Sequence, residues 1–368
     1  MALALLAQLP PTRFARLGRA PALVVLLLTL LAIGLLTTFA VTYRGPIDAI
    51  VSTPGNGDLA TYSQVVDDMR KGEPYYAAAH KELVAGHYGT RSVFNWRLPT
   101  LSWAWSKLPN AIWAKAALLT MAVIALMLVF TWFTSGVSPL MGLLAVPPVV
   151  FNLAGCLPTG AELLADVVAG VLILVSVAAY GLRARPIGFL TAVLALFIKE
   201  LSAPYIVVCI IQAWRGRRYG ELAAWLVALG AFSAFFLWHA RMVEAHIAPG
   251  DIAYREGWLQ FGGLPFVLAT AGFNGVLLAA PLWITAIVAP LSILGLAAWD
   301  GPAGDRVRLT VGAYLVLFLF VGKAFDVYWG AFYTPLMMLG LPFVPRALID
   351  LAIALRDRSP APTVPASP

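Results

Sequence analysis

The sequence predicts an all-α membrane protein with about ten transmembrane helices and a helical outer loop after the first of them. Of its 368 residues, 61% are hydrophobic and only 12% are charged, and the mean hydropathy is +0.84. A soluble fold of this size would need more polar surface. Apolar runs long enough for a helix to cross a bilayer recur along the chain. We expect one membrane domain over residues 1–358 and a disordered Pro/Ala/Ser-rich tail at 359–368.

Basic residues set the expected orientation of the helices. Arg13, Arg16 and Arg19 precede an apolar run that we interpret as an uncleaved first span at 20–43. By the positive-inside rule, the later basic clusters should lie on the same, inner side. These clusters are Arg183/Arg185, Arg215/Arg217/Arg218, Arg306/Arg308 and Arg346/Arg356/Arg358. The net charge of +7 therefore reflects topology, and we expect no nucleic-acid partner.

Residues 44–109 form the one long segment that does not resemble a membrane helix. Apolar residues recur at helical spacing over 59–69, and Gly72 and Pro74 should end that helix. A second short helix is predicted over 75–84. Both are expected to lie on the outer membrane surface rather than to cross the bilayer.

The other spans follow from the apolar runs. They are expected at about 110–134, 138–156 (interrupted by Pro147-Pro148), 160–182, 219–240, 274–299, 309–323 and 331–353. Residues 186–214 lie between two basic clusters, so a hairpin is favoured over a single helix. Each arm would rise about 20 Å, less than the hydrocarbon core of about 30 Å. The tip, Lys199-Glu200, should therefore be recessed below the outer surface.

The ionisable residues at membrane depth all fall on the outer side in this topology. Such groups are costly in a membrane, so they usually line a polar cavity or pair with one another. They are Glu162, Asp166, Lys199, Glu200 and Lys323.

Three of the carboxylates have two interpretations each. Asp58 fits a helix N-cap and also a proton acceptor at the membrane surface, and the two are compatible. Thr159 to Glu162 fits a capping box at the start of the fourth span. Asp166, one turn deeper, does not fit a cap. Glu162 and Asp166 would bind a cation on their shared helix face or pair with Lys199, and the sequence leaves the use of a divalent cation open.

The basic and aromatic candidates also have one functional and one ordinary interpretation each. Lys199 and Glu200 either neutralise each other or, because neighbours on a helix point about 100° apart, leave Lys199 free to offset the charge of a lipid-linked phosphate. Other candidates for that task, or else ordinary interfacial anchors, are Arg97, Arg241, Arg255 and Lys323. Tyr328 would stack on a sugar or belong to the aromatic belt.

This layout resembles the GT-C superfamily of integral-membrane glycosyltransferases, and most closely its bacterial mannosyltransferase-like branch. The matching motifs are short: Gly57-Asp58 with Tyr62, Gly72-Glu73-Pro74-Tyr75-Tyr76, Arg97-Leu98-Pro99-Thr100, Glu162, and Phe197-Ile198-Lys199-Glu200. The chain departs from many members in lacking a second acidic residue beside Asp58 and a large soluble C-terminal domain.

The resemblance implies an inverting transfer of a sugar from a polyprenyl-phosphate donor to a glycan or lipid acceptor. Asp58 would be the general base, and Lys199, with Arg97 or Arg241, would stabilise the leaving phosphate. The implied location is the bacterial inner membrane, with the active site on the extracytoplasmic side. A transporter or lipid flippase is the main alternative, although transporters place their sites near the midplane between repeated halves. A non-catalytic scaffold is a third interpretation.

Overall fold

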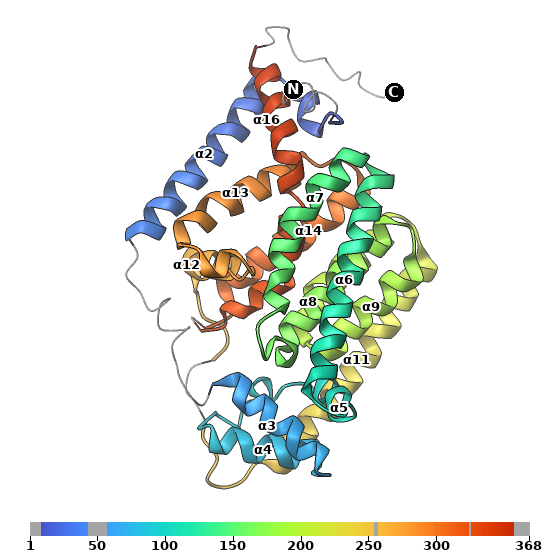
Figure 1. Ribbon diagram of the computed structural model, residues 1–368, viewed down its shortest axis with the longest axis vertical. Helices are drawn as coiled ribbons and strands as arrows, with labels where there is room; N and C mark the ends of the chain where they lie inside the picture. The colour runs from blue at the N-terminus through green and yellow to red at the C-terminus, as the bar shows by residue number, and fades with distance from the viewer. Residues whose placement is uncertain (1–8, 43–56, 254–256, 324, 357–368) are drawn as a thin grey trace.

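The computed structural model describes residues 9–42, 57–253, 257–323 and 325–356 (Figure 1). Within these ranges the secondary structure is helical, apart from turns and one isolated bridge between Leu259 and Val321. The predicted all-α fold is confirmed. Arg255, the tail at 359–368 and the turn that precedes Gly57 lie outside the described residues.

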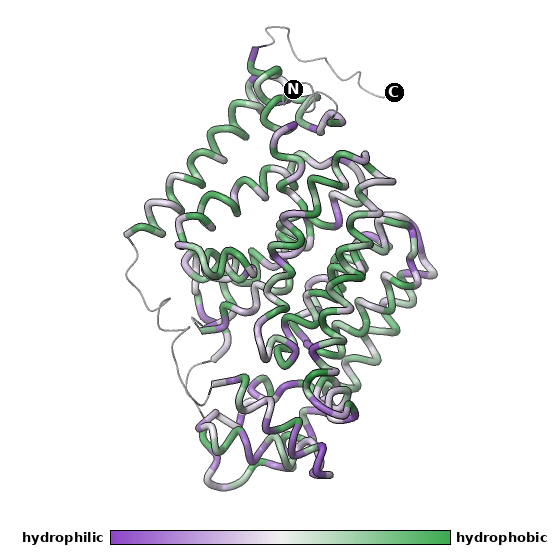
Figure 2. Tube along the Cα trace, in the orientation of Figure 1, coloured by the Kyte–Doolittle hydropathy of each residue, from purple (hydrophilic) through white to green (hydrophobic). Residues whose placement is uncertain are grey.

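Within the described ranges, five helical stretches are long and apolar enough to cross a membrane. They are α2 (Arg19–Thr42), α6 (Ala111–Gly136), α7 with the turn after it (Pro139–Cys156), α11 (Tyr219–His246) and the composite Thr334–Arg356. The shorter apolar helices are α8 (Ala165–Gly181), α9 (Arg185–Ile198) and α13 (Leu282–Ala298). Apolar residues cover most of these helices, whereas hydrophilic residues gather in the outer loop and at the turns (Figure 2). A multi-pass membrane protein follows, while the number of about ten crossings stays a prediction.

Several predicted helix boundaries are wrong. α7 runs through Pro147 and Pro148 without a break, since a membrane helix tolerates proline where neighbouring groups satisfy the freed carbonyls. The predicted span 274–299 begins only at Leu282, after Pro281, and a separate helix, α12 (Gly263–Ala271), precedes it.

The predicted span 331–353 is divided into short pieces, because prolines and close helix contacts interrupt it. These pieces are η8 (Val327–Phe332), α15 (Thr334–Met338), η9 (Leu341–Phe343) and α16 (Val344–Arg356). Pro335 and Pro342 occupy first-turn positions, where a proline starts a helix but cannot continue one. Gly340 lies against α13, where a Cβ atom would come within 2.0 Å of the Ser292 carbonyl.

The hairpin predicted over 186–214 is confirmed as two antiparallel arms. α9 returns from the basic turn at Arg183, and α10 (Ala203–Arg215) runs back to the basic cluster at its end. The tip consists of Lys199 and the short η6 (Glu200–Ser202). At 14 and 13 residues, the arms rise about 20 Å each.

The first outer loop forms a helical layer at one end of the molecule, as predicted (Figure 1). It contains α3 (Asp58–Arg70), α4 (Tyr75–Ala85), η3 (Val93–Asn95) and α5 (Pro99–Ser106). Gly72 takes the left-handed conformation (φ +100°) that turns the chain from α3 to α4. This layer packs on the end of α11, where the Tyr76 hydroxyl lies 2.9 Å from Nδ1 of His239.

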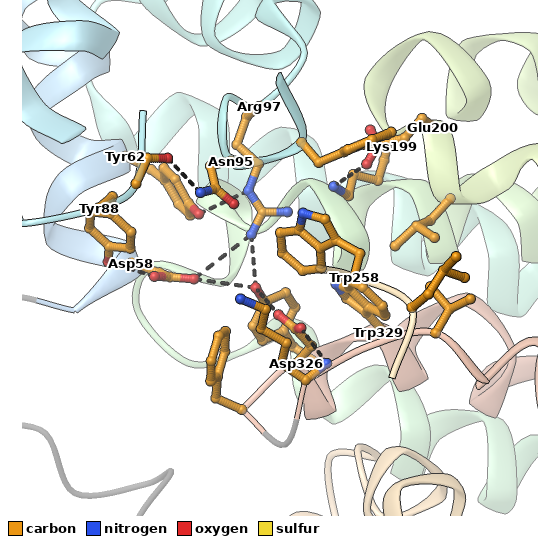
Figure 3. A pocket seen from close by; sticks show the side chains of 18 residues that line it. Asp58, Tyr62, Tyr88, Asn95, Arg97, Lys199, Glu200, Trp258, Asp326 and Trp329 are labelled. Atoms are coloured by element: carbon orange, nitrogen blue, oxygen red, sulfur yellow. Dashed lines mark hydrogen bonds and ion pairs between the residues drawn. The ribbon is translucent and has the colours of Figure 1, made fainter. Parts of the chain in front are cut away.

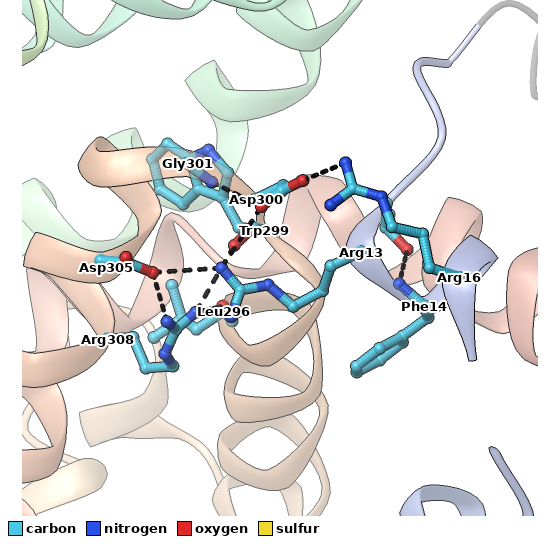
Figure 4. Close-up of polar contacts among 10 residues, drawn as sticks. Arg13, Phe14, Arg16, Leu296, Trp299, Asp300, Gly301, Asp305 and Arg308 are labelled. Carbon is cyan, nitrogen blue, oxygen red and sulfur yellow. Dashed lines mark hydrogen bonds and ion pairs between the residues drawn. The ribbon is translucent and has the colours of Figure 1, made fainter. Parts of the chain in front are cut away.

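The described basic clusters lie at the opposite end. There the N-terminal η1 (Arg13–Arg16) contacts the link between α13 and α14 (Gly301–Phe320), with Arg13 bound to Asp305 (3.1 Å) and Arg16 to Asp300 (2.7 Å) (Figure 4). α8 begins beside the loop layer, where Asp166 contacts Arg97, and ends at the basic turn that contains Arg183. The structure therefore separates a basic end from an end that carries the outer loop.

Candidate active site

A cavity of about 360 Å³ lies where the loop layer meets the ends of the membrane helices (Figure 3). Its wall combines α3, the 88–97 segment, the tip of the α9–α10 hairpin, and the segments 258–259 and 321–329. Six residues predicted from the sequence line it: Asp58, Arg97, Lys199, Glu200, Lys323 and Tyr328. Their convergence joins groups separated by well over a hundred positions in the chain.

Asp58 opens α3 with its carboxylate directed into the cavity. Gly57 is the N-cap residue and makes no side-chain cap, so Asp58 is the first helical residue rather than the cap. Its carboxylate accepts hydrogen bonds from the hydroxyls of Tyr88 (2.6 Å) and Tyr328 (3.3 Å). With a side chain that is 32% exposed, Asp58 is the accessible carboxylate of this network.

Arg97 is held by partners on three sides. Its Nε donates to the Tyr62 hydroxyl (2.9 Å), Nη1 to Asp166 (3.0 Å) and Nη2 to the Tyr328 hydroxyl (3.1 Å). The guanidinium lies 4.9 Å from the centre of the Tyr62 ring, a cation–π distance. Nη2 is also 3.8 Å from the Asp58 carboxylate, so Arg97 helps to hold Asp58 in position.

The two carboxylates near the start of α8 have different roles from those predicted. Asp166 is fully buried and pairs with Arg97 rather than with Lys199. Glu162 lies in a 3₁₀ turn before α8, makes no capping bond, and pairs with Lys115 (2.8 Å) away from the cavity. The capping-box interpretation of Glu162 is therefore wrong, and Glu162 does not line this cavity.

Lys199 and Glu200 form a local ion pair, Nζ to Oε1 2.5 Å, at the recessed tip. Of the two alternatives that the sequence left open, mutual neutralisation is the one that the structure has, and the argument from helical spacing is wrong. α9 ends at Ile198, and the Lys199 backbone is extended (φ −150°, ψ 121°), so helical spacing does not apply there. The Lys199 charge is therefore already compensated within the cavity wall.

Lys323 has a different environment. Its ammonium lies 5.2 Å from the centre of the Trp258 ring, and no carboxylate pairs with it within the described part of the chain. Trp258 in turn stacks on Trp329 at 5.7 Å. Arg241 is exposed on α11 and does not line the cavity, so the structure does not bring it to this site.

Two polar groups of the site were not singled out for a role by the sequence. Tyr88 follows a left-handed turn at His87, and nothing in the sequence pattern marks it. Asp326 is 1% exposed, accepts the Lys323 backbone N–H (2.9 Å) and receives the Tyr328 hydroxyl (3.1 Å). Burial raises the pKa of Asp326 to about 6. The signal available in the sequence was that Asp326 lies among apolar residues, with Trp329 nearby.

Across the described residues, no group of three or more His, Cys, Asp or Glu side chains is placed to hold a metal ion. The chain matches no family model, no curated protein and no solved structure.

Proposed function

We propose that this protein is a membrane glycosyltransferase that moves a sugar from a polyprenyl-phosphate donor to a glycan or lipid acceptor. The observation that carries the proposal is the shared cavity. An accessible carboxylate, Asp58, faces the same space as the cations Lys199 and Lys323, at the boundary between the loop layer and the membrane helices. A base for a hydroxyl and positive charge for a departing phosphate are the two requirements of this transfer.

In the proposed reaction the acceptor hydroxyl gives its proton to Asp58 and attacks the anomeric carbon. The bond from that carbon to the phosphate oxygen breaks, and its electron pair leaves with polyprenyl phosphate. Lys323 offsets the charge that develops on the phosphate, with a smaller contribution from Lys199, which Glu200 already compensates. Attack opposite to the leaving group inverts the anomeric configuration.

Arg97 supports this chemistry without acting as a free cation. Its donors are directed to Tyr62, Asp166 and Tyr328, so it orients the network around the base. Trp258, half-buried in the cavity wall, is an aromatic residue of the kind against which a sugar ring packs.

The recessed hairpin tip suits a lipid donor. A phosphate at headgroup depth would reach Lys199 while its polyprenyl chain stayed in hydrocarbon. Because the basic clusters lie at the opposite end, the positive-inside rule favours a cavity that opens on the extracytoplasmic side. The corresponding location is the bacterial inner membrane.

The test is turnover by purified protein in nanodiscs. Synthetic short-chain polyprenyl phosphates carrying mannose, glucose, galactose or arabinose serve as donors, with a cell-envelope extract as the acceptor source. Release of polyprenyl phosphate is measured by mass spectrometry. Asp58→Asn should lower kcat by about 100-fold or more, while Asp67→Asn, an exposed carboxylate on the same helix, should not.

Two results would contradict the proposal. One is unchanged release by Asp58→Asn at normal protein level. The other is movement of the labelled lipid across vesicles without release of polyprenyl phosphate from any of the four donors, which would favour a transporter or flippase.

A further inference from the structure

The Tyr328 hydroxyl stands between two carboxylates. It lies 3.3 Å from Oδ2 of Asp58 and 3.1 Å from Oδ1 of Asp326. Nη2 of Arg97 donates to the same oxygen from 3.1 Å. Because a tyrosine hydroxyl has one proton, it can donate to only one of the two carboxylates at a time.

The two carboxylates differ in their access to substrate. The Asp58 side chain is 32% exposed in the cavity, whereas Asp326 is 1% exposed. The second oxygen of Asp326 accepts the Lys323 backbone N–H at 2.9 Å, which fixes the carboxylate in one orientation. A hydroxyl on an acceptor would therefore meet Asp58 first and Asp326 only through Tyr328.

The surroundings of Asp326 also suit a group that gains and loses a proton. Burial raises its pKa to about 6, while the Lys323 N–H, Tyr328 and Arg97 act in the opposite direction and Asp166 adds to the rise. The Lys323 ammonium is directed instead to the Trp258 ring. Asp326 is then ionised at neutral pH but close enough to protonation to accept a proton in turnover.

We propose that Asp326 is the second member of a proton relay that clears the catalytic base, with Tyr328 as the bridge. This inference rests on the proposed function. After Asp58 takes the proton of the acceptor hydroxyl, the Asp58 O–H bond breaks and the proton moves to the Tyr328 oxygen. At the same time the original Tyr328 O–H bond breaks and its proton forms a new bond to Oδ1 of Asp326.

The relay leaves every charge accounted for. Asp58 returns to its ionised form, Tyr328 stays neutral, and Asp326 becomes a neutral acid. Asp326 forms part of the cavity wall, so water that enters after the products leave takes up its proton. Arg97 holds the bridging oxygen throughout, so the transfer needs only the short movement of two protons. The base would thus be restored even while products still occupy the cavity.

A purely architectural role for Asp326 makes a different prediction. In that case its function would be to accept the Lys323 N–H and shape the turn into η8. An asparagine oxygen can accept the same bond, so Asp326→Asn retains the architecture and removes the proton acceptor. Tyr328→Phe removes the bridge and leaves both carboxylates in place.

The experiment measures the pH dependence of kcat in nanodiscs, with release of polyprenyl phosphate as the readout. Wild-type kcat should fall as the pH drops through about 6, because Asp326 is then already protonated. Asp326→Asn should lower kcat about tenfold at neutral pH with KM little changed, and should lose this limb of the profile. Tyr328→Phe should behave alike, and the double variant should be no worse than either single variant.

If Asp326→Asn kept the wild-type kcat at neutral pH and the wild-type pH dependence of kcat, the relay alone would be overturned. Absence of turnover in the wild type would instead overturn the proposed function, and the relay with it. Infrared titration of the purified protein supplies a readout independent of activity: the band of a protonated carboxyl should appear near pH 6 and be missing in Asp326→Asn. A wild-type spectrum without that band would also overturn the proposal.

Discussion

Arg97 in the outer loop and Asp166 at the start of α8 form an ion pair, Nη1 to Oδ2 3.0 Å. The Arg97 side chain is 13% exposed and that of Asp166 is fully buried. This buried pair is one of the polar connections between the loop layer and the membrane helices, and it lies beside Asp58. Its geometry determines where Tyr62 and Tyr328 stand.

Removing either partner should therefore destabilise the protein. Arg97→Gln or Asp166→Asn leaves a buried charge without its counterion, which costs about 3–5 kcal/mol. The combined variant should lose less than the sum of the two, because neither charge then remains unpaired. Thermal unfolding in nanodiscs measures the difference.

A matched arginine at the other end of the molecule supplies the control. Arg16 also pairs with an aspartate, Asp300, at 2.7 Å, but its side chain is 78% exposed. Arg16→Gln should cost less than about 1 kcal/mol. Equal losses of stability in Arg16→Gln and Arg97→Gln would show that burial does not increase the contribution of the Arg97 pair to stability.

The two cavity lysines should differ in their affinity for phosphate. Lys199 is compensated by Glu200 at 2.5 Å, whereas no carboxylate pairs with Lys323 in the described ranges. Lys323→Met should weaken binding of a short-chain polyprenyl phosphate about tenfold, and Lys199→Met should weaken it less. Native mass spectrometry or calorimetry in nanodiscs gives the Kd values.

Glu200→Gln completes this comparison. It frees the Lys199 ammonium, so it should tighten binding of the same lipid phosphate. If Lys199→Met proved the more damaging lysine change, or if Glu200→Gln weakened binding, compensation by Glu200 would not control the site.

The sequence was sufficient to predict the hairpin and the position of Lys199, Glu200 and Lys323 on the side of the outer loop. Those predictions rest on charge asymmetry and helix length, which act over many residues. The sequence did not predict side-chain positions that depend on the rotation of a helix about its axis or on one tertiary partner. Arg241 lies on the exposed face of α11 while His239, two positions earlier, is buried, because adjacent helical positions diverge around the axis.

Glu162 shows the second kind of failure. Its spacing from Thr159 fits a capping box, but Lys115 from α6 provides a stronger partner than the backbone N–H of a cap. Such a partner lies far away in the sequence and belongs to the tertiary fold. The same reason hides Tyr88 and Asp326, whose importance depends on the single hydroxyl or carboxylate that each faces.

The segment after α11, residues 247–253, should be fastened to the first outer loop through His80 and Asp251. Nε2 of His80 lies 2.9 Å from Oδ2 of Asp251, and the ring stacks on Trp96 at 5.8 Å. His80→Gln or Asp251→Asn should therefore raise amide exchange in residues 248–253, measured by mass spectrometry, while α6 stays unchanged. Unaltered exchange in both variants would show that backbone contacts alone, such as Thr90 to Ile252, hold this loop.

Asp68 should make the loop layer sensitive to acid. Its carboxylate accepts bonds from Lys81, Lys71 (3.1 Å) and Gln64 (3.2 Å). The hydrogen bond from Lys81 is the main reason that the pKa of Asp68 is lowered from 3.8 to about 2. A carboxylate with a lowered pKa stabilises the folded state above its unfolded pKa, and that contribution is lost as the pH falls from about 4 to about 2.

The expected size is modest because solvent surrounds the partners: the Lys71 and Lys81 side chains are 69% and 52% exposed. Asp68→Asn should cost about 1 kcal/mol of loop stability at neutral pH, and the gap from the wild type should close as the pH approaches 2. Limited proteolysis of the loop across this pH range measures it. Asp67→Asn, whose carboxylate is 45% exposed, is the control. A gap between wild type and Asp68→Asn that stays constant with pH would mean that the loss comes from packing rather than from the ionised carboxylate.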